Sequence, residues 1–289
     1  MDLLASTSIS SCHECVATLT LPLALFVLLA ETAVGGMATV AYLRMTGGLT
    51  HGFLKFIAVT YLVLGVLALL VVWAGPPGSY RDLFPISQPA AGSLVFLQSL
   101  LVIALGVQVI VTWRRKEGSR LSWLATMAAC GVLLAGIAAS FWPLASSATD
   151  GIVLVLAVIV SSVVLGAATT GMLLGHWYLV TPALTNRPLL RAIVVLLIGL
   201  VLQAVAFPLA LGGLGHGSSP ARALGLSPVL SILWALGAVA LPLMAAAPAL
   251  ATCRIRSFMS TTGLLYLAMI ALLPGQLLGQ LLVFVAAAR

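Results

Sequence analysis

The chain is a succession of long apolar segments joined by short loops, and this pattern restricts it to a bundle of membrane-spanning helices. Each segment holds about 20 or more mostly apolar residues, enough to cross roughly 30 Å of hydrocarbon. Only 7% of the residues are charged, against about 25% in soluble domains. We predict an all-α polytopic integral membrane protein with eight transmembrane helices near residues 17–43, 53–75, 92–113, 121–143, 152–179, 192–213, 227–250 and 260–285.

Ten of the thirteen Lys and Arg residues lie in alternate loops, and this alternation orients the chain. The basic loops are Arg44 to Lys55, Arg114 to Arg120, Arg187 to Arg191 and Arg254 to Arg256. Loops that stay in the cytoplasm are enriched in Lys and Arg, so we expect the other loops and both the N and C termini to lie outside. The predicted location is the cytoplasmic (inner) membrane of a bacterial or archaeal-type cell, with the lipid bilayer as the main neighbour.

The net charge of +7 would suggest nucleic-acid binding in a soluble protein. Here the positive charge lies in the inner loops, where anionic lipid headgroups are the expected neighbours. We therefore expect no nucleic-acid partner. The loops are also too short for a separate soluble domain, which favours a protein that works through partner subunits.

The two halves of the chain resemble each other at an offset of 136 residues. The aligned residues are Gly35 with Gly171, Tyr42 with Tyr178, Leu43 with Leu179, and Lys55 with Arg191. Because each copy would carry four spans, both copies would have the same orientation in the membrane. We predict two tandem four-helix bundles, residues 1–146 and 147–289, related by an axis along the membrane normal. Small residues such as Gly166 and Gly275 are expected to let helices approach closely.

Glu31 is the only acidic residue deep within a predicted span. A charged carboxylate there costs about 2.5–3.5 kcal/mol on insertion scales, so it should face the bundle interior or be protonated. It is a candidate proton acceptor or partner for a quinol hydroxyl, and a neutral Glu bonded to a neighbouring helix is the alternative. Gln276 and Gln280 share one face of the last predicted span and could line a small polar cavity.

A second group of candidate residues lies at the inner ends of the spans. His176, Trp177 and Tyr178 end the fifth predicted span. Histidine titrates near neutrality and suits proton-coupled electron transfer, and a His beside aromatic rings can bind a quinone carbonyl. His51 lies in the inner turn before the second span and would reach the same interface if the two bundles pack together. Aromatic residues of the membrane interface also occur beside a His without any function.

Ligands for other cofactors are few. Buried haem needs axial ligands from facing helices; only His176 lies within a span, with His51 at a margin, so haem is not expected. Cys12 and Cys15 form a C-x-x-C pair before the first span, which suits dithiol exchange or half of a zinc site. A structural disulfide or an idle tail is the alternative. The sequence has no second Cys pair, so we predict no metal site.

Eight spans as two four-helix bundles, both termini outside, no haem chain and almost no loops resemble the membrane anchor subunits of the NrfD, polysulfide reductase and dimethyl sulfoxide reductase type. The resemblance covers the whole chain in its architecture. It implies a quinone or quinol held between the spans, and partner subunits that carry iron–sulfur clusters and a molybdenum or cytochrome centre. The chain would then be a subunit of a quinone-linked oxidoreductase, non-catalytic alone. On chemical grounds, the candidate quinone-binding residues are Glu31, His176, Trp177, Tyr178 and His51.

Two features do not follow from that resemblance. Such anchors place their quinone near the outer face, whereas Glu31 lies nearer mid-membrane and His176 on the inner side. The pair Cys12 and Cys15 also has no counterpart in it.

Two other functions remain open. A secondary transporter or permease fits the internal repeat and the spans that contain Pro. The near absence of intramembrane charge would limit such a transporter to a neutral or lipophilic substrate. A thiol-redox protein that uses Cys12 and Cys15 would need a second, intramembrane thiol pair, which the sequence lacks.

Overall fold

The computed structural model describes residues 2–114, 119–181, 185–214 and 228–287, and the side chains from Leu19 on, with Pro228 excepted. Within these residues the protein is helical, and eight helices are long and apolar enough to cross a membrane. The predicted all-α fold with eight spans is confirmed, as expected of a multi-pass membrane protein. The orientation of the termini and the division into two four-helix bundles stay predictions.

The first six spans are single helices, and the seventh is composite. The helices are α1 (Asp2–Thr46), α2 (His51–Ala74), α3 (Gln88–Arg114), α4 (Arg120–Phe141), α5 (Ala148–Val180), α6 (Arg187–Gly212) and α10 (Phe258–Ala287). The seventh span consists of α8 (Pro228–Trp234), the π-helix η3 (Ala235–Ala240) and α9 (Leu241–Arg254). Short 3₁₀ turns follow α2 (η1, Pro77–Tyr80) and α4 (η2, Trp142–Leu144).

Local sequence signals explain where several helices begin and end. The hydroxyl of Thr50 accepts a hydrogen bond from the Phe53 amide and caps α2, and Ser147 caps α5 in the same way through the Asp150 amide. Gly47 and Gly48 follow α1 with φ of 78° and 100°, a backbone region that suits glycine and ends a helix.

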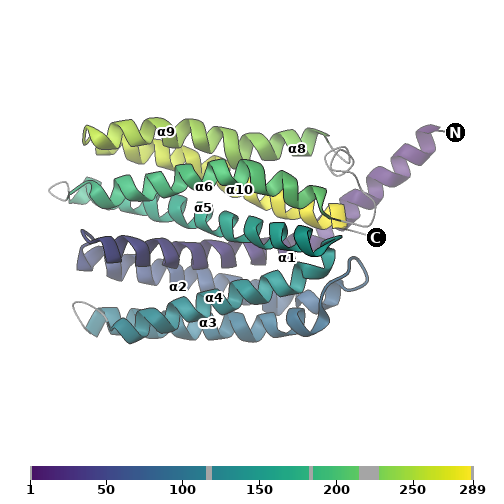
Figure 1. Cartoon of the computed structure of the whole chain (residues 1–289), viewed down its shortest axis with the longest axis horizontal. Coiled ribbons are helices and arrows are strands. Elements are labelled where there is room, and N and C mark those ends of the chain that lie inside the picture. Colours follow the sequence, from purple (N-terminus) through teal and green to yellow (C-terminus); the bar gives the residue numbers. More distant parts are fainter. Residues whose placement is uncertain (1, 115–118, 182–184, 215–227, 288–289) are drawn as a thin grey trace.

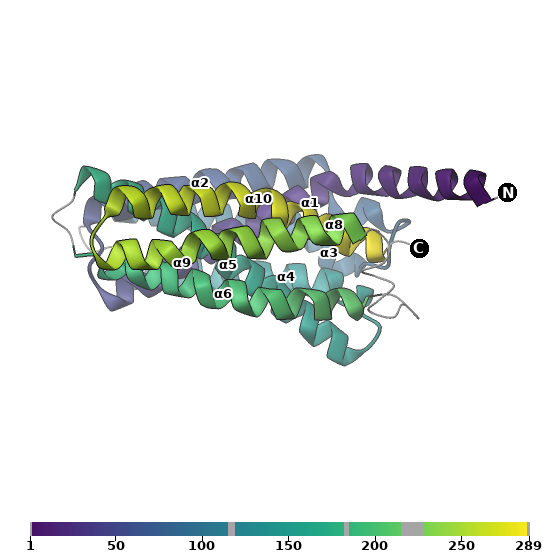
Figure 2. The same ribbon diagram turned by 90° about the horizontal axis from the view of Figure 1, so that it is seen from above.

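The first helix lies at the centre of the bundle. Of its most apolar window 83% is buried, against 28–56% for the other seven spans, because α1 packs against α2, α5 and α10 at once. The α1 helix begins and α10 ends at the same end of the bundle, and the basic loops lie at the opposite end (Figure 1). Beyond the bundle, the N-terminal part of α1 continues as a projecting helix, which both views show (Figure 2).

Helices α1 and α5 cross in backbone contact where glycines face each other. A Cβ added to Gly166 would lie 1.9 Å from the backbone carbon of Gly35, and one on Gly35 would lie 1.7 Å from the Ser162 carbonyl oxygen. Any side chain there would force the helices apart. The prediction that Gly166 and Gly275 permit close approach is confirmed, since Gly275 meets the backbone of Gly237 in the same manner.

The π-helix of the seventh span is stabilised by a side chain from α6. Pro242 has no amide hydrogen, so it cannot donate the helical hydrogen bond to the Ala238 carbonyl four residues earlier. The Gln203 side chain supplies the missing donor, with Nε2 3.0 Å from the Ala238 oxygen. Single-turn π-helices of this kind occur often at functional sites.

Candidate functional site

Glu31 lies near the middle of α1 and is fully buried. Glu31 is twelve residues after Leu19, where the described span begins, and this places it about 18 Å along the helix from that end of the span. The expectation that Glu31 faces the interior of the bundle is therefore confirmed. The central position of α1 turns its side chain toward α5 and α10 rather than toward lipid.

Two neighbouring helices donate hydrogen bonds to this carboxylate. Ser161 Oγ of α5 lies 2.6 Å from Glu31 Oε2. The Gln280 amide of α10 bridges both oxygens, with Nε2 3.3 Å from Oε1 and 3.2 Å from Oε2. These contacts connect α1, α5 and α10 at one point.

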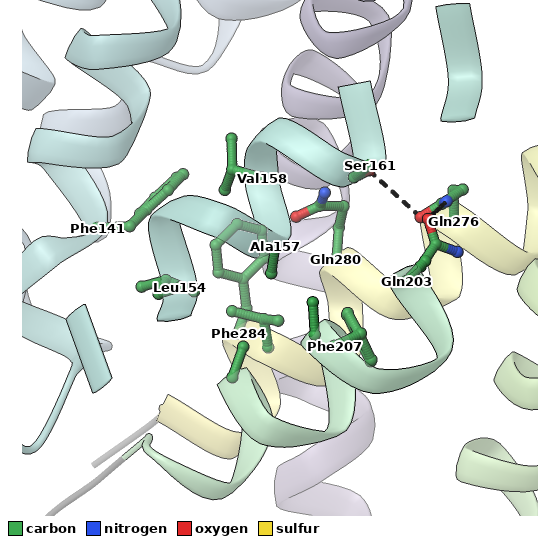
Figure 3. A pocket seen from close by; sticks show the side chains of 13 residues that line it. Phe141, Leu154, Ala157, Val158, Ser161, Gln203, Phe207, Gln276, Gln280 and Phe284 are labelled. Atoms are coloured by element: carbon green, nitrogen blue, oxygen red, sulfur yellow. Dashed lines mark hydrogen bonds between the residues drawn. The ribbon is translucent and has the colours of Figure 1, made fainter. Parts of the chain in front are cut away.

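The polar contacts continue from Ser161 into the second half of the chain. Gln276 Oε1 lies 3.4 Å from Ser161 Oγ, and Gln276 Nε2 donates to Gln203 Oε1. Gln203 in turn donates to the Ala238 carbonyl. A series of polar contacts therefore connects Glu31 of α1 to the π-helix, through Ser161 of α5, Gln276 of α10 and Gln203 of α6. Figure 3 shows the part of this series that runs from Ser161 to Gln203.

A cavity opens beside this series, between α5, α6 and α10. Its polar end holds Ser161, Gln203, Gln276 and Gln280. From there it extends toward the end of the bundle where the termini lie, along a wall of apolar side chains: Phe141, Leu154, Val158, Phe207, Ala210, Val283 and Phe284 (Figure 3). As predicted, Gln276 and Gln280 line a small cavity, but most of its lining is apolar rather than polar.

The cavity is narrow in this conformation because aromatic rings pack around its apolar part. Phe284 stacks on Phe84 and tilts against Phe141, with ring centroids 5.4 Å apart in both pairs, and Phe207 stacks on Trp234 at 4.2 Å. The volume is about 30 Å³. One water needs about 10–15 Å³ on this scale, so the space holds one or two water molecules. A ring-sized ligand would enter only after these side chains moved.

Charge is sparse throughout the described residues. Among these residues, Arg81 and Asp82 form an ion pair, 3.6 Å apart in the loop between α2 and α3. No Lys, Arg or His among the described residues forms an ion pair with Glu31. The same residues hold no cluster of three or more His, Cys, Asp and Glu side chains. The electrostatics of the site therefore rest on one carboxylate and on neutral hydroxyl and amide groups.

The other predicted residues lie together at the end of the bundle opposite the start of α1, away from Glu31. The Trp177 ring packs against Phe53 and Phe56 of α2, with centroids 6.0 and 6.1 Å away, and also meets Gly52, the neighbour of His51. Tyr178 is buried, and its hydroxyl donates to the Thr185 carbonyl at 2.5 Å.

His176 points away from this packing and is exposed at the bundle surface. It follows Ser161 by fifteen residues on α5, about 22 Å along the helix axis. One small ligand cannot contact both Glu31 and His176, so the structure divides the predicted site residues into two separate groups.

Sequence reasoning missed Ser161 and the role of Gln203. Serine is common in membrane helices, and nothing in the sequence singles out Ser161 among its neighbours. Gln203 was visible as a polar residue in a span, and Pro242 marks a helix carbonyl that needs another donor. The pairing of the two depends on the register of α6 against the seventh span.

The pair Cys12 and Cys15 falls on α1 where side chains lie outside the described residues. Comparisons with known proteins add no further constraint: no family model, curated protein or solved structure matches the chain.

Proposed function

We propose that the protein is the membrane subunit of a quinone-linked redox complex, and that a quinol binds in the cavity between α5, α6 and α10. The observation that supports this most strongly is the placement of Glu31, a fully buried carboxylate that accepts hydrogen bonds from Ser161 and Gln280, two residues at the polar end of an otherwise apolar cavity. Ligand sites of this kind are largely apolar, with a few polar groups that fix the orientation of the ligand.

The chemistry follows from the two ends of the cavity. Oxidation of a quinol releases two electrons and two protons. Glu31 would accept one proton by way of the Ser161 hydroxyl, which lines the cavity and bonds to the carboxylate. The second proton would leave to water at the other end of the cavity, and the amides of Gln276 and Gln280 offer hydrogen bonds to the oxidised ring. The apolar wall that includes Phe207 and Phe284 suits an aromatic ring and its hydrocarbon tail.

In this proposal the electrons leave through partner subunits. These would carry iron–sulfur clusters and a molybdenum or cytochrome centre, while this chain anchors them to the cytoplasmic membrane and binds the quinol. Both termini would lie on the outer side, with the chain arranged as two tandem four-helix bundles. The cavity then opens toward the outer side, because its apolar part extends toward the end where α1 begins and α10 ends.

The test is quinol turnover by the complex purified gently from the native membrane, with its subunits identified by mass spectrometry. Glu31→Gln keeps the shape of the side chain and removes the proton acceptor, so turnover should fall about 10²-fold or more. Gln108→Leu is the matched control, since that buried amide bonds to Thr112 of its own helix. Wild-type turnover in Glu31→Gln, or a chain that purifies without redox partners, would contradict the proposal.

A secondary transporter is the second candidate, and one observation favours it. The seventh span is broken by a π-helix whose Ala238 carbonyl contacts the series of polar side chains, and transporters bind substrates beside interrupted helices near mid-membrane. Uptake of a neutral or lipophilic solute by the chain alone in liposomes, lost in Gln203→Leu, would favour transport over redox chemistry.

A further inference from the structure

Ser161 lies beside two oxygen atoms that could each accept a hydrogen bond from it, but its hydroxyl has only one hydrogen to donate. Its single hydroxyl hydrogen can be given to one acceptor. Glu31 Oε2 is 2.6 Å away and Gln276 Oε1 is 3.4 Å away, so an ionised Glu31 takes that hydrogen. Gln276 Oε1 then faces Ser161 Oγ without a donor from any described residue.

Three oxygens of different side chains therefore lie next to one another in the buried interior, with Ser161 Oγ in contact with the other two. They are the carboxylate of Glu31, the hydroxyl of Ser161 and the amide oxygen of Gln276, and all three residues are at most 7% exposed. Hard cations prefer ligands of this type, namely carboxylate, hydroxyl and carbonyl oxygens. The adjoining cavity adds room for one or two water ligands.

The charge of the site also calls for a cation. An ionised Glu31 would be a single negative charge at mid-membrane, and no described Lys, Arg or His pairs with it. Such a charge is costly unless it is neutralised. One monovalent cation brings the site to zero net charge, whereas a divalent cation would leave an excess positive charge in the same apolar surroundings.

We propose that Glu31, Ser161 and Gln276 form a binding site for a small monovalent cation, with Na⁺ as the physiological ion. In secondary transporters, Na⁺ is coordinated near mid-membrane by oxygen atoms, there backbone carbonyls. The inference goes beyond the proposed function, because it requires neither a quinol nor a partner subunit. A proton on Glu31 is the competing occupant, since it would donate to Ser161 and free the Ser161 hydroxyl for Gln276.

The first test measures the unfolding temperature of the purified full chain in NaCl, KCl and N-methylglucamine chloride at equal ionic strength. Binding to the folded state should raise the midpoint in NaCl by on the order of 5 °C over the other two salts. Glu31→Gln and Ser161→Ala should fold and lose this difference. Gln98→Leu removes a buried amide elsewhere, which donates to the Gly65 carbonyl, and should keep it.

The second test follows the reaction of a hydrophobic carbodiimide, which modifies protonated carboxyl groups, with Glu31 by mass spectrometry. Na⁺ should slow the modification about tenfold at a concentration ten times its Kd, by simple competition. The modification should be absent in Glu31→Gln, and in Gln276→Leu it should persist without protection by Na⁺. A midpoint and a labelling rate that are the same in all three salts would overturn the proposal and leave the proton as the only occupant.

Discussion

The two halves of the chain treat their buried polar side chains differently. In α2 to α4, most such side chains bond to a backbone oxygen or within their own helix: Gln98 to Gly65, Gln108 to Thr112, Thr126 to Ser122 and Ser140 to Gly136. Tyr61 of α2 is the exception, since its hydroxyl lies 2.6 Å from that of Thr170 of α5. In α5, α6 and α10, buried side chains bond to one another across helices and end at Glu31. The first pattern satisfies polar groups locally, and the second connects four helices.

This difference indicates where function is concentrated. A side chain that bonds to its own helix satisfies its own polar atoms and does not constrain the positions of the neighbouring helices. A series of bonds between helices fixes their relative positions and depends on every member. The cavity between α5, α6 and α10 lies beside the second kind of contact, although α1, from the first half, supplies the carboxylate.

The largest effect is expected where the two halves meet. In Gly166→Leu the new Cβ would lie 1.9 Å from the backbone of Gly35, so α1 and α5 would have to separate along their length. Overpacking of a core costs about 1–3 kcal/mol even where side chains can adjust, and here the obstacle is backbone. We expect loss of the monodisperse folded protein in size-exclusion chromatography.

Gly106→Leu is the matched control for that variant. Gly106 of α3 has no atom within 4 Å of an added Cβ, and leucine is the better helix former by about 0.8–1 kcal/mol. The variant should fold as well as the wild type. Equal behaviour of the two leucine variants would show that the crossing of α1 and α5 tolerates separation.

Gln203→Leu should have the next largest effect, because it leaves the Ala238 carbonyl without a donor. The expected loss of stability is about 1–3 kcal/mol, the cost of an unsatisfied buried group. Restoring a backbone amide with Pro242→Ala should recover much of that loss, which a double-mutant cycle on thermal unfolding would measure. Additive effects of the two substitutions would contradict the idea that Gln203 replaces the donor that Pro242 lacks.

Much of the architecture could be predicted because the length and hydropathy of a segment are enough to identify a membrane-spanning helix. Length and hydropathy gave the eight spans, and burial of the lone carboxylate followed from the cost of exposing it to lipid. Close approach at Gly166 and Gly275 followed from the absence of a side chain. The projecting N-terminal part of α1 was not expected, since the apolar run begins only near residue 17.

The site could be predicted only in part, because its contacts join residues far apart in sequence. Glu31 is 130 positions from Ser161 and 249 from Gln280. Which serine or glutamine meets it depends on the rotation and register of each helix, and hydropathy does not specify either. The rotation of α5 also places His176 at the surface, which hydropathy does not specify, and its distance along α5 separates it from Glu31.

A smaller effect is expected for Gln98→Leu in the first half. Gln98 donates to Gly65 at 2.8 Å, but the residue four positions after Gly65 is Leu69, which retains the amide that serves the same carbonyl. Hydrogen bonds between membrane helices contribute on average about 0.6 kcal/mol. Thermal unfolding should therefore show that the free energy of unfolding falls by about that amount, and Pro242→Ala should not restore it. A loss as large as that of Gln203→Leu would remove the distinction between the halves.

The smallest effect is expected for His176→Ala near the C-terminal end of α5. The side chain is exposed, so stability should change by less than about 0.5 kcal/mol. Quinol turnover should also stay near the wild-type rate, because Ser161, the α5 residue that contacts Glu31, lies about 22 Å away along the helix axis. Trp177→Ala, one residue on, is the informative comparison: its ring packs on Phe53 and Phe56, so its removal should destabilise the protein measurably. A tenfold loss of turnover in His176→Ala with unchanged stability would move the quinol site to the inner end of the bundle.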